Sequence, residues 1–155
     1  MLRTFMIVAA AALTLSTAAF AQQGGTAEEA RAMLDKPVTA VKADKTKAIS
    51  MFNKGEGGFL DRDLYVFCSN TTDGTIVALG NPNGKKLLGT DVRSLKDAND
   101  KAYGQEIFAA GQKPEGKITE ISGYMFPRPS DPKPVSKNSF VTNVGDLNCG
   151  VGYYK

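Results

Sequence analysis

The sequence contains no histidine and only two cysteines in 155 residues. Without histidine there is no imidazole general base, and zinc sites built from cysteine and histidine are excluded as well. A c-type haem is excluded because its Cys-x-x-Cys-His attachment site does not occur. The formal net charge is only +3, with both signs scattered along the chain, which argues against nucleic acid as a partner. No cofactor is expected.

The N-terminal end has the layout of a secretory signal peptide. Arg3 gives a charged start, an apolar run covers residues 5–15, and Ala19-Phe20-Ala21 is a small-residue cleavage site. We therefore expect residues 1–21 to be removed and the mature protein to be periplasmic or secreted. An uncleaved anchor is the alternative, but the apolar core is short and rich in alanine for a membrane span. No later stretch of the sequence is expected to span a membrane.

The rest of the chain has the size of one domain, which is enough to bury a hydrophobic core without a metal or several disulfides. Residues 22–25 are expected to be a flexible lead-in, and residues 26–155 a single domain. Cys68 and Cys149 lie far apart in a chain bound for an oxidising compartment, so a structural disulfide is expected. Two buried free thiols, or redox catalysis, are the alternatives.

A long helix is predicted after the lead-in. Thr26 and Glu29 form a capping box at its start, and apolar residues recur at helical spacing as far as Phe52. Gly55 is a natural end for it. Pro37 interrupts the pattern, because its ring displaces a carbonyl of the preceding turn and it has no amide to donate. A kink or a split of the helix is therefore expected at Pro37.

Five segments have the composition and spacing of strands. They are residues 64–68, 75–79, 118–126, 138–144 and 148–154. The first is apolar without a break, so it is expected to be a central strand covered on both faces. A proline-rich bend is expected between the third and fourth strands. Between the second and third, the sequence predicts a long loop followed by a short helix over residues 103–110.

Five short motifs follow one another along the chain at a characteristic spacing. They are Asp63-Leu64-Tyr65-Val66-Phe67-Cys68, Asp73-Gly74-Thr75-Ile76, Leu87-Leu88-Gly89-Thr90-Asp91, Tyr124-Met125-Phe126-Pro127-Arg128-Pro129 and Cys149-Gly150-Val151-Gly152-Tyr153-Tyr154-Lys155. In this order, they resemble the motifs of a single Cache domain, of the stand-alone kind that many proteobacteria export. The resemblance covers nearly all of residues 26–155.

This resemblance implies an α+β, PAS-like fold. In it, a long N-terminal helix packs on a five-stranded antiparallel sheet with a loop-helix insertion after strand 2, and ligands lie between the insertion and the other face of the sheet. The first and last strands are neighbours in that topology, which implies that Cys68 and Cys149 come within bonding reach.

The resemblance also implies a function. Relatives joined to chemoreceptors and histidine kinases bind small carboxylates, amino acids or similar metabolites. We therefore expect a small-molecule binding or sensing domain without its own output domain, with a membrane receptor or transporter as its partner. The alternative is a structural or interaction protein that has lost ligand binding. The sequence departs from the family pattern at one place: Ala78-Leu79-Gly80 stands where relatives are expected to have Ala-His-Pro. The identity of the ligand therefore cannot be copied from a relative.

An anionic metabolite needs cations or hydrogen-bond donors in an otherwise apolar cleft, which gives seven candidate ligand contacts. Arg128 is the best single candidate, since its planar guanidinium binds a carboxylate with two hydrogen bonds. Its structural alternative is an exposed arginine at a strand end. The aromatic candidates have core packing as their alternative, Lys137 a solvated edge position, and Arg93 a pair with a nearby aspartate. The seven candidates are Tyr65, Arg93, Tyr103, Tyr124, Phe126, Arg128 and Lys137.

The sequence does not favour an enzyme. Catalysis needs a nucleophile or a perturbed acid and base, whereas the acidic residues around the candidate contacts fall in turns or at helix starts, where capping accounts for them. These acidic residues are Asp61, Asp63, Asp91, Asp97 and Glu106.

Overall fold

The structure is a computed structural model that describes residues 24–155. The signal peptide predicted at residues 1–21, and the first half of the predicted lead-in, lie outside the described residues. Within residues 24–155, no helix is both long enough and apolar enough to cross a membrane.

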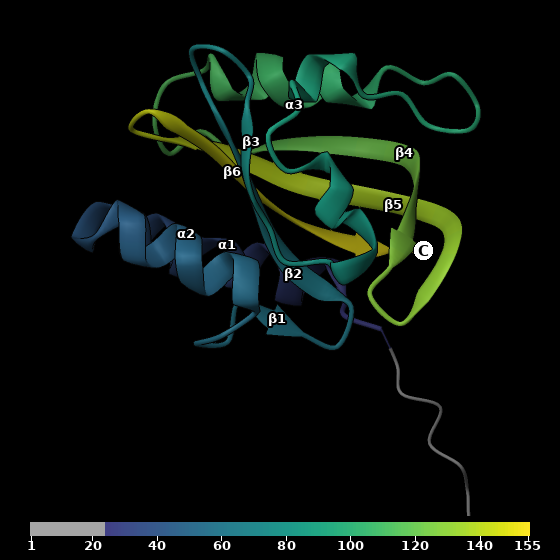
Figure 1. The fold of residues 1–155 in the computed structure, drawn as a ribbon, viewed down its shortest axis with the longest axis horizontal. Coiled ribbons are helices and arrows are strands. Elements are labelled where there is room, and N and C mark those ends of the chain that lie inside the picture. Colours follow the sequence, from purple (N-terminus) through teal and green to yellow (C-terminus); the bar gives the residue numbers. More distant parts are fainter. Residues whose placement is uncertain (1–23) are drawn as a thin grey trace, which may run out of the picture.

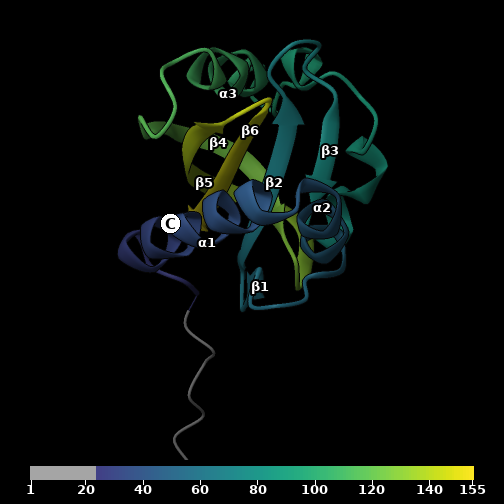
Figure 2. The same ribbon diagram turned by 90° about the vertical axis from the view of Figure 1, so that its left-hand side faces the viewer.

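Two helices pack on one face of an antiparallel sheet, and a loop-helix segment packs on the other face (Figures 1 and 2). This confirms the predicted α+β architecture. Residues 81–111, which lie between β3 and β4, are called the covering segment below. The elements are α1 (Ala27–Ala43), α2 (Lys45–Lys54), β1 (Leu60–Asp61), β2 (Leu64–Asn70), β3 (Ile76–Leu79), η1 (Pro82–Leu87), η2 (Val92–Ser94), α3 (Tyr103–Gly111), β4 (Thr119–Arg128), β5 (Asp131–Val144) and β6 (Leu147–Tyr154).

The five predicted strands are β2 to β6, and the two-residue β1 adds a sixth. β2 pairs with β1 and β3 on one side and with β6 on the other, and β5 and β4 follow β6 in order. The first and last of the predicted strands are thus neighbours at the centre of the sheet. This places the apolar run of β2 between other strands, as its composition predicts.

The helical region differs from the prediction, because it breaks at Asp44 and not at Pro37. Helix α1 begins with the predicted capping box and continues through the buried Pro37 to Ala43. Asp44 then takes an extended conformation with φ at −159°, and its side chain accepts the amide hydrogen of Lys47, which caps α2. A short polar side chain that satisfies a free helical amide thus sets the boundary.

The turn between β4 and β5 is also shorter than the predicted proline-rich bend. Pro127 lies within β4, opposite Pro134 of β5, and Pro132 is also within β5. The strands accommodate these prolines because β5 pairs with β6 only from Lys137 onward. The prolines are therefore in a two-stranded part of the hairpin, where a missing amide removes no bond from the sheet interior.

The sheet separates two apolar cores. Along β2, Leu64, Val66 and Cys68 face the helices, whereas Tyr65 joins the core under the covering segment. This alternation follows from the two-residue period of a strand. The core on the helix side is completed by α1 and α2, with Phe52 fully buried among its residues.

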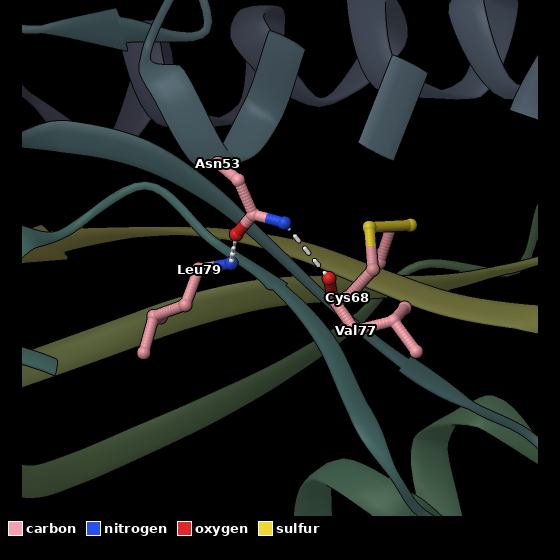
Figure 3. The surroundings of a disulfide bond; sticks show 5 residues. Asn53, Cys68, Val77 and Leu79 are labelled. Atoms are coloured by element: carbon pink, nitrogen blue, oxygen red, sulfur yellow. Dashed lines mark hydrogen bonds between the residues drawn. A yellow bond between two sulfur atoms is a disulfide. The ribbon is translucent and has the colours of Figure 1, made fainter. Parts of the chain in front are cut away.

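The predicted disulfide is confirmed. Cys68 of β2 and Cys149 of β6 lie directly opposite each other, with their Cα atoms 4.1 Å apart and their sulfur atoms bonded on the helix side of the sheet (Figure 3). Beside the bond, Asn53 of α2 donates to the carbonyl of Val77 and accepts from the amide of Leu79. The Asn53 side chain thereby makes the hydrogen bonds that a neighbouring strand would otherwise make to the backbone at the outer edge of β3.

Candidate functional site

A small cavity lies between the sheet and the covering segment. The sheet supplies its wall from β2, β3, β4 and β5, and the covering segment closes it with apolar side chains and one tyrosine. The cavity has a volume of about 40 Å³. Its lining from the sheet includes Tyr65, Phe67, Ser69, Tyr124, Phe126 and Lys137, and its lining from the covering segment is Leu87, Val92, Leu95, Tyr103 and Ile107.

Lys137 is the charged residue of this lining, and only 1% of its surface is exposed. Its Nζ atom donates a hydrogen bond to the hydroxyl of Tyr65. The same atom lies 3.9 Å from the ring centre of Tyr65, 5.1 Å from those of Phe126 and Tyr154, and 5.8 Å from that of Phe67. Four aromatic rings therefore surround the amino group, an arrangement that attracts cations.

No carboxylate of residues 24–155 forms an ion pair with this amino group. Asp63 influences it from a distance, but the Asp63 carboxylate already accepts from Arg128 at 3.0 Å and from the amide of Gly25 at 2.6 Å. Burial lowers the pKa of Lys137 well below its ordinary value, and the charge of Asp63 opposes this only in part.

Two glycines of β6 make room for this arrangement. Gly150 and Gly152 are on the cavity side of β6, where they alternate with the helix-facing Cys149 and Val151. A Cβ atom at position 152 would overlap with Cε of Lys137, and one at position 150 would overlap with the ring of Phe67. The missing side chain at position 152 thus provides the space in which the lysine stem lies, and the one at position 150 leaves room for the ring of Phe67.

Hydroxyl groups supply the other polar atoms near the cavity. The rings of Tyr103 and Tyr124 stack 4.5 Å apart, and the hydroxyl of Tyr124 is 2.6 Å from that of Ser139. Burial raises the pKa of Tyr65 and of Tyr124 well above 10, and it raises the pKa of Tyr103 to about 12. All three hydroxyls therefore keep their protons at neutral pH and remain hydrogen-bond donors.

A hydrogen-bonded path connects the cavity to the far end of β4. The hydroxyl of Tyr65 is 3.4 Å from that of Tyr154, which donates to the carbonyl of Pro127 at 2.6 Å. The side chain of Asn81, at the start of the covering segment, donates to the same carbonyl at 2.7 Å. The site is thus held by contacts from three separate parts of the chain.

Comparison with known proteins agrees with this architecture. Residues 10–154 match the family model described as Single Cache domain 2. The chain belongs to this family. Cache domains are sensor domains and not a catalytic family. No curated protein matches the chain.

Three solved structures are similar to this Cache domain. A methyl-accepting chemotaxis protein from Vibrio parahaemolyticus is 22% identical, with a TM-score of 0.64 over 82% of this chain and 86% of that one. The periplasmic sensor domain of a chemotaxis protein is 20% identical, with a TM-score of 0.58 over 82% and 88%. A Cache chemosensory domain solved for carboxylic acid recognition is 20% identical, with a TM-score of 0.57 over 82% and 86%. At these identities, the likeness shows a shared fold.

The Cache fold brings five of the seven predicted contacts together, and it places the two arginines elsewhere. Arg93 is exposed, bonded to the carboxylate of Asp91 and stacked 4.8 Å from the ring centre of Phe108. Arg128 binds Asp63 and lies 4.9 Å from the ring centre of Tyr154, outside the cavity lining. The five that line the cavity are Tyr65, Tyr103, Tyr124, Phe126 and Lys137.

Asp63 has a role that the sequence did not indicate. The sequence predicts capping of a turn for it, but it is 5% exposed and accepts hydrogen bonds from both the Arg128 guanidinium and the Gly25 amide. Gly25, at the end of the predicted flexible lead-in, is consequently buried and bonded. Two of the four aromatic residues around the Lys137 amino group, Phe67 and Tyr154, are not among the seven predicted contacts. The position of Phe67, two residues after Tyr65 in one strand, was a usable signal for the first of them.

Proposed function

We propose that this Cache domain binds a short carboxylate in the cavity, with the ammonium group of Lys137 as its counter-ion. The observation that carries the proposal is a fully buried lysine that lines a cavity and has no carboxylate partner among the described residues. An isolated buried charge is costly, and a bound anion offsets that cost. The carboxylic acid recognition of a related Cache chemosensory domain supports the same class of ligand.

The size and lining of the cavity favour a very short acid. A volume of 40 Å³ corresponds to about three water molecules, which suits acids of about two or three carbons. The ligand's oxygens would accept from Lys137 and from the hydroxyl of Tyr65. Its methyl or ethyl group would contact the apolar side of the cavity, formed by residues such as Leu95 and Ile107.

An extracytoplasmic location fits this function. The disulfide is typical of oxidising compartments, and a similar structure is a periplasmic sensor domain. The signal peptide at residues 1–21 and a membrane receptor or transporter as partner stay predictions from the sequence.

Thermal unfolding in the presence of a series of acids tests the proposal. We expect acetate and propionate, but not hexanoate, to raise the melting temperature, because a ligand that binds only the folded state stabilises it by mass action. At about 100 times Kd, the added stability is about 2.7 kcal/mol. Lys137→Met should abolish the effect, whereas Lys133→Met, an exposed position in the same strand, should keep it.

Two outcomes would contradict the proposal. If acetate and propionate shift the melting temperature of the Lys137→Met variant as much as that of the unmodified chain, the lysine is not the counter-ion. If no short acid shifts the unmodified chain at millimolar concentration, the alternative of a structural or interaction protein is favoured.

A further inference from the structure

The amino group of Lys137 becomes a nucleophile when it loses its proton. Its burial among aromatic rings lowers its pKa well below the ordinary lysine value, which increases the share of neutral amine. Desolvated lysines in their neutral form attack carbonyl carbons and form Schiff bases. The carboxylate binding described above uses the charged form of the same nitrogen, so the neutral form remains available for a second chemistry.

The surroundings of the nitrogen suit an attack on a carbonyl group. The hydroxyl of Tyr65 lies within hydrogen-bond distance of Nζ, and the hydroxyl of Tyr154 is 3.4 Å from that of Tyr65. Burial keeps the Tyr65 hydroxyl protonated, so it is a donor to an oxygen bound beside Nζ. The nitrogen is also shielded from bulk water, which favours an imine over its hydrolysis.

We propose that Lys137 forms a reversible imine with a short 2-oxo acid that enters the cavity, an inference that rests on the proposed binding of short carboxylates. The nitrogen lone pair forms a bond to the keto carbon, and the bond between that carbon and its oxygen breaks. The oxygen takes one proton from the nitrogen and one from solvent, and it leaves as water. The reaction needs no oxidant or reductant, and water reverses it.

The charge of the product favours a 2-oxo acid over a simple aldehyde. The protonated imine is positive and the acid's own carboxylate is negative, so the adduct brings an ion pair with no net charge into an apolar cavity. An aldehyde would form an imine without this internal counter-ion. Glyoxylate and pyruvate are the smallest 2-oxo acids, and the small cavity limits the ligand to this size range.

Other described lysines lack this combination of features. Burial also lowers the pKa of Lys85, but its ammonium group donates to the backbone carbonyls of Asn53 and Leu79, and it does not line the cavity. Lys133 is in the same strand as Lys137 and is exposed to solvent. Lys133 therefore serves as the matched reference for an ordinary lysine.

Reductive trapping on the full chain tests the imine. The folded protein is incubated with glyoxylate or pyruvate and sodium cyanoborohydride, which converts an imine into a stable secondary amine, and peptides are then mapped by mass spectrometry. We expect labelling at Lys137 about tenfold or more faster than at Lys133, since each unit of pKa difference changes the neutral fraction tenfold. Excess propionate, which has no keto group, should slow labelling at Lys137 only. Lys137→Arg should remove the fast label, and Lys133→Arg should keep it.

Labelling in proportion to exposure, or labelling at Lys137 that propionate does not slow, would overturn the proposal. Calorimetry with propionate distinguishes a failure of the imine proposal from a failure of the proposed carboxylate binding. If propionate binds and Lys137 stays unlabelled, the imine is wrong and carboxylate binding stands; if propionate does not bind either, both are wrong. The position of the label in the unmodified chain is the primary measurement, so the result does not depend on the folding of a Lys137 variant.

Discussion

Lys137 is stabilised by ring faces and one hydroxyl, where most buried lysines have a carboxylate. A desolvated cation over an aromatic ring gains about 2 kcal/mol, whereas burial of an unpaired charge costs considerably more. The rings therefore compensate only part of the cost. The proposed carboxylate ligand would account for a residue that weakens the empty protein in this way.

The burial of Lys137 should be visible in the pH dependence of stability. The pKa is lowered in the folded state, so between the lowered value and the ordinary value of 10.5 the unfolded chain binds more protons than the folded chain. The free energy of unfolding of the unmodified chain should therefore rise with pH in this window, relative to that of Lys137→Met, by at most about 1.4 kcal/mol per pH unit.

Urea denaturation of both proteins from pH 6 to pH 10 measures this difference, with pH values chosen to bracket the ordinary titration range. The buried tyrosines are common to both proteins, so their titration cancels in the comparison. Parallel stability curves over the whole range would mean that Lys137 has no lowered pKa.

At the scale of elements, the strands were predictable because their signals are local. Alternation or unbroken apolar runs mark β2 to β6, and the capping box marks the start of α1. The wrong details have two kinds of cause. The helix breaks at Asp44 for a local reason, the cap that Asp44 provides to the amide of Lys47, whereas Pro132 and Pro134 are tolerated in β5 because β6 does not extend beside them. A pattern within one segment does not reveal where a neighbouring strand ends.

Local patterns carry no information about contacts between distant positions, and this also decides which parts of the site were predictable. Tyr65, Tyr124 and Lys137 were identified by residue type and by their place in strands. The pairing of Arg128 with Asp63 joins positions 65 residues apart, and no local pattern indicates which acid an arginine meets. Arg128 is consequently in an ion pair beside the site, and the less favoured Lys137 is the cation in the cavity.

The bond between the two central strands should make a large contribution to stability. Cys68 and Cys149 are separated by 81 residues, and closing a loop of this length restricts the unfolded chain. We expect the double variant Cys68→Ala/Cys149→Ala to lose about 2–5 kcal/mol of unfolding free energy. Urea denaturation measures the loss, and the unmodified chain under reducing conditions is the control. An unchanged midpoint in both would contradict this contribution.

For the whole molecule, the two faces of the sheet differ in how they are covered. The helix side has α1, α2 and the disulfide, whereas the cavity side has two 3-10 turns and a nine-residue helix. Side chains attach the covering segment to the sheet: Asp97 accepts from the amide of Met125, and Asn148 donates to the carbonyl of Ile107. The amide of Met125 contributes most to lowering the pKa of Asp97, so this link persists in mildly acidic solution.

Ligand binding should therefore affect the two faces unequally. We expect saturating propionate to slow amide hydrogen exchange in η2 and α3, which contact the cavity, and to leave exchange in the middle of α1 nearly unchanged. Hydrogen exchange with mass spectrometry measures both regions in one experiment, with hexanoate as the inactive control. Equal protection of both faces would indicate general stabilisation without a site under the covering segment.

The glycine at position 152 has a consequence for variation among relatives. Any side chain there would meet the stem of Lys137, so the identities of residues 137 and 152 are not independent. A relative that acquires alanine or a larger residue at 152 must move the end of the Lys137 side chain, and it must also move Ser139, which is directly opposite Gly152 in β5. We therefore expect residues 137 and 152 to change together among relatives. A relative that differs at either position is expected to bind a different ligand in this cavity, or none.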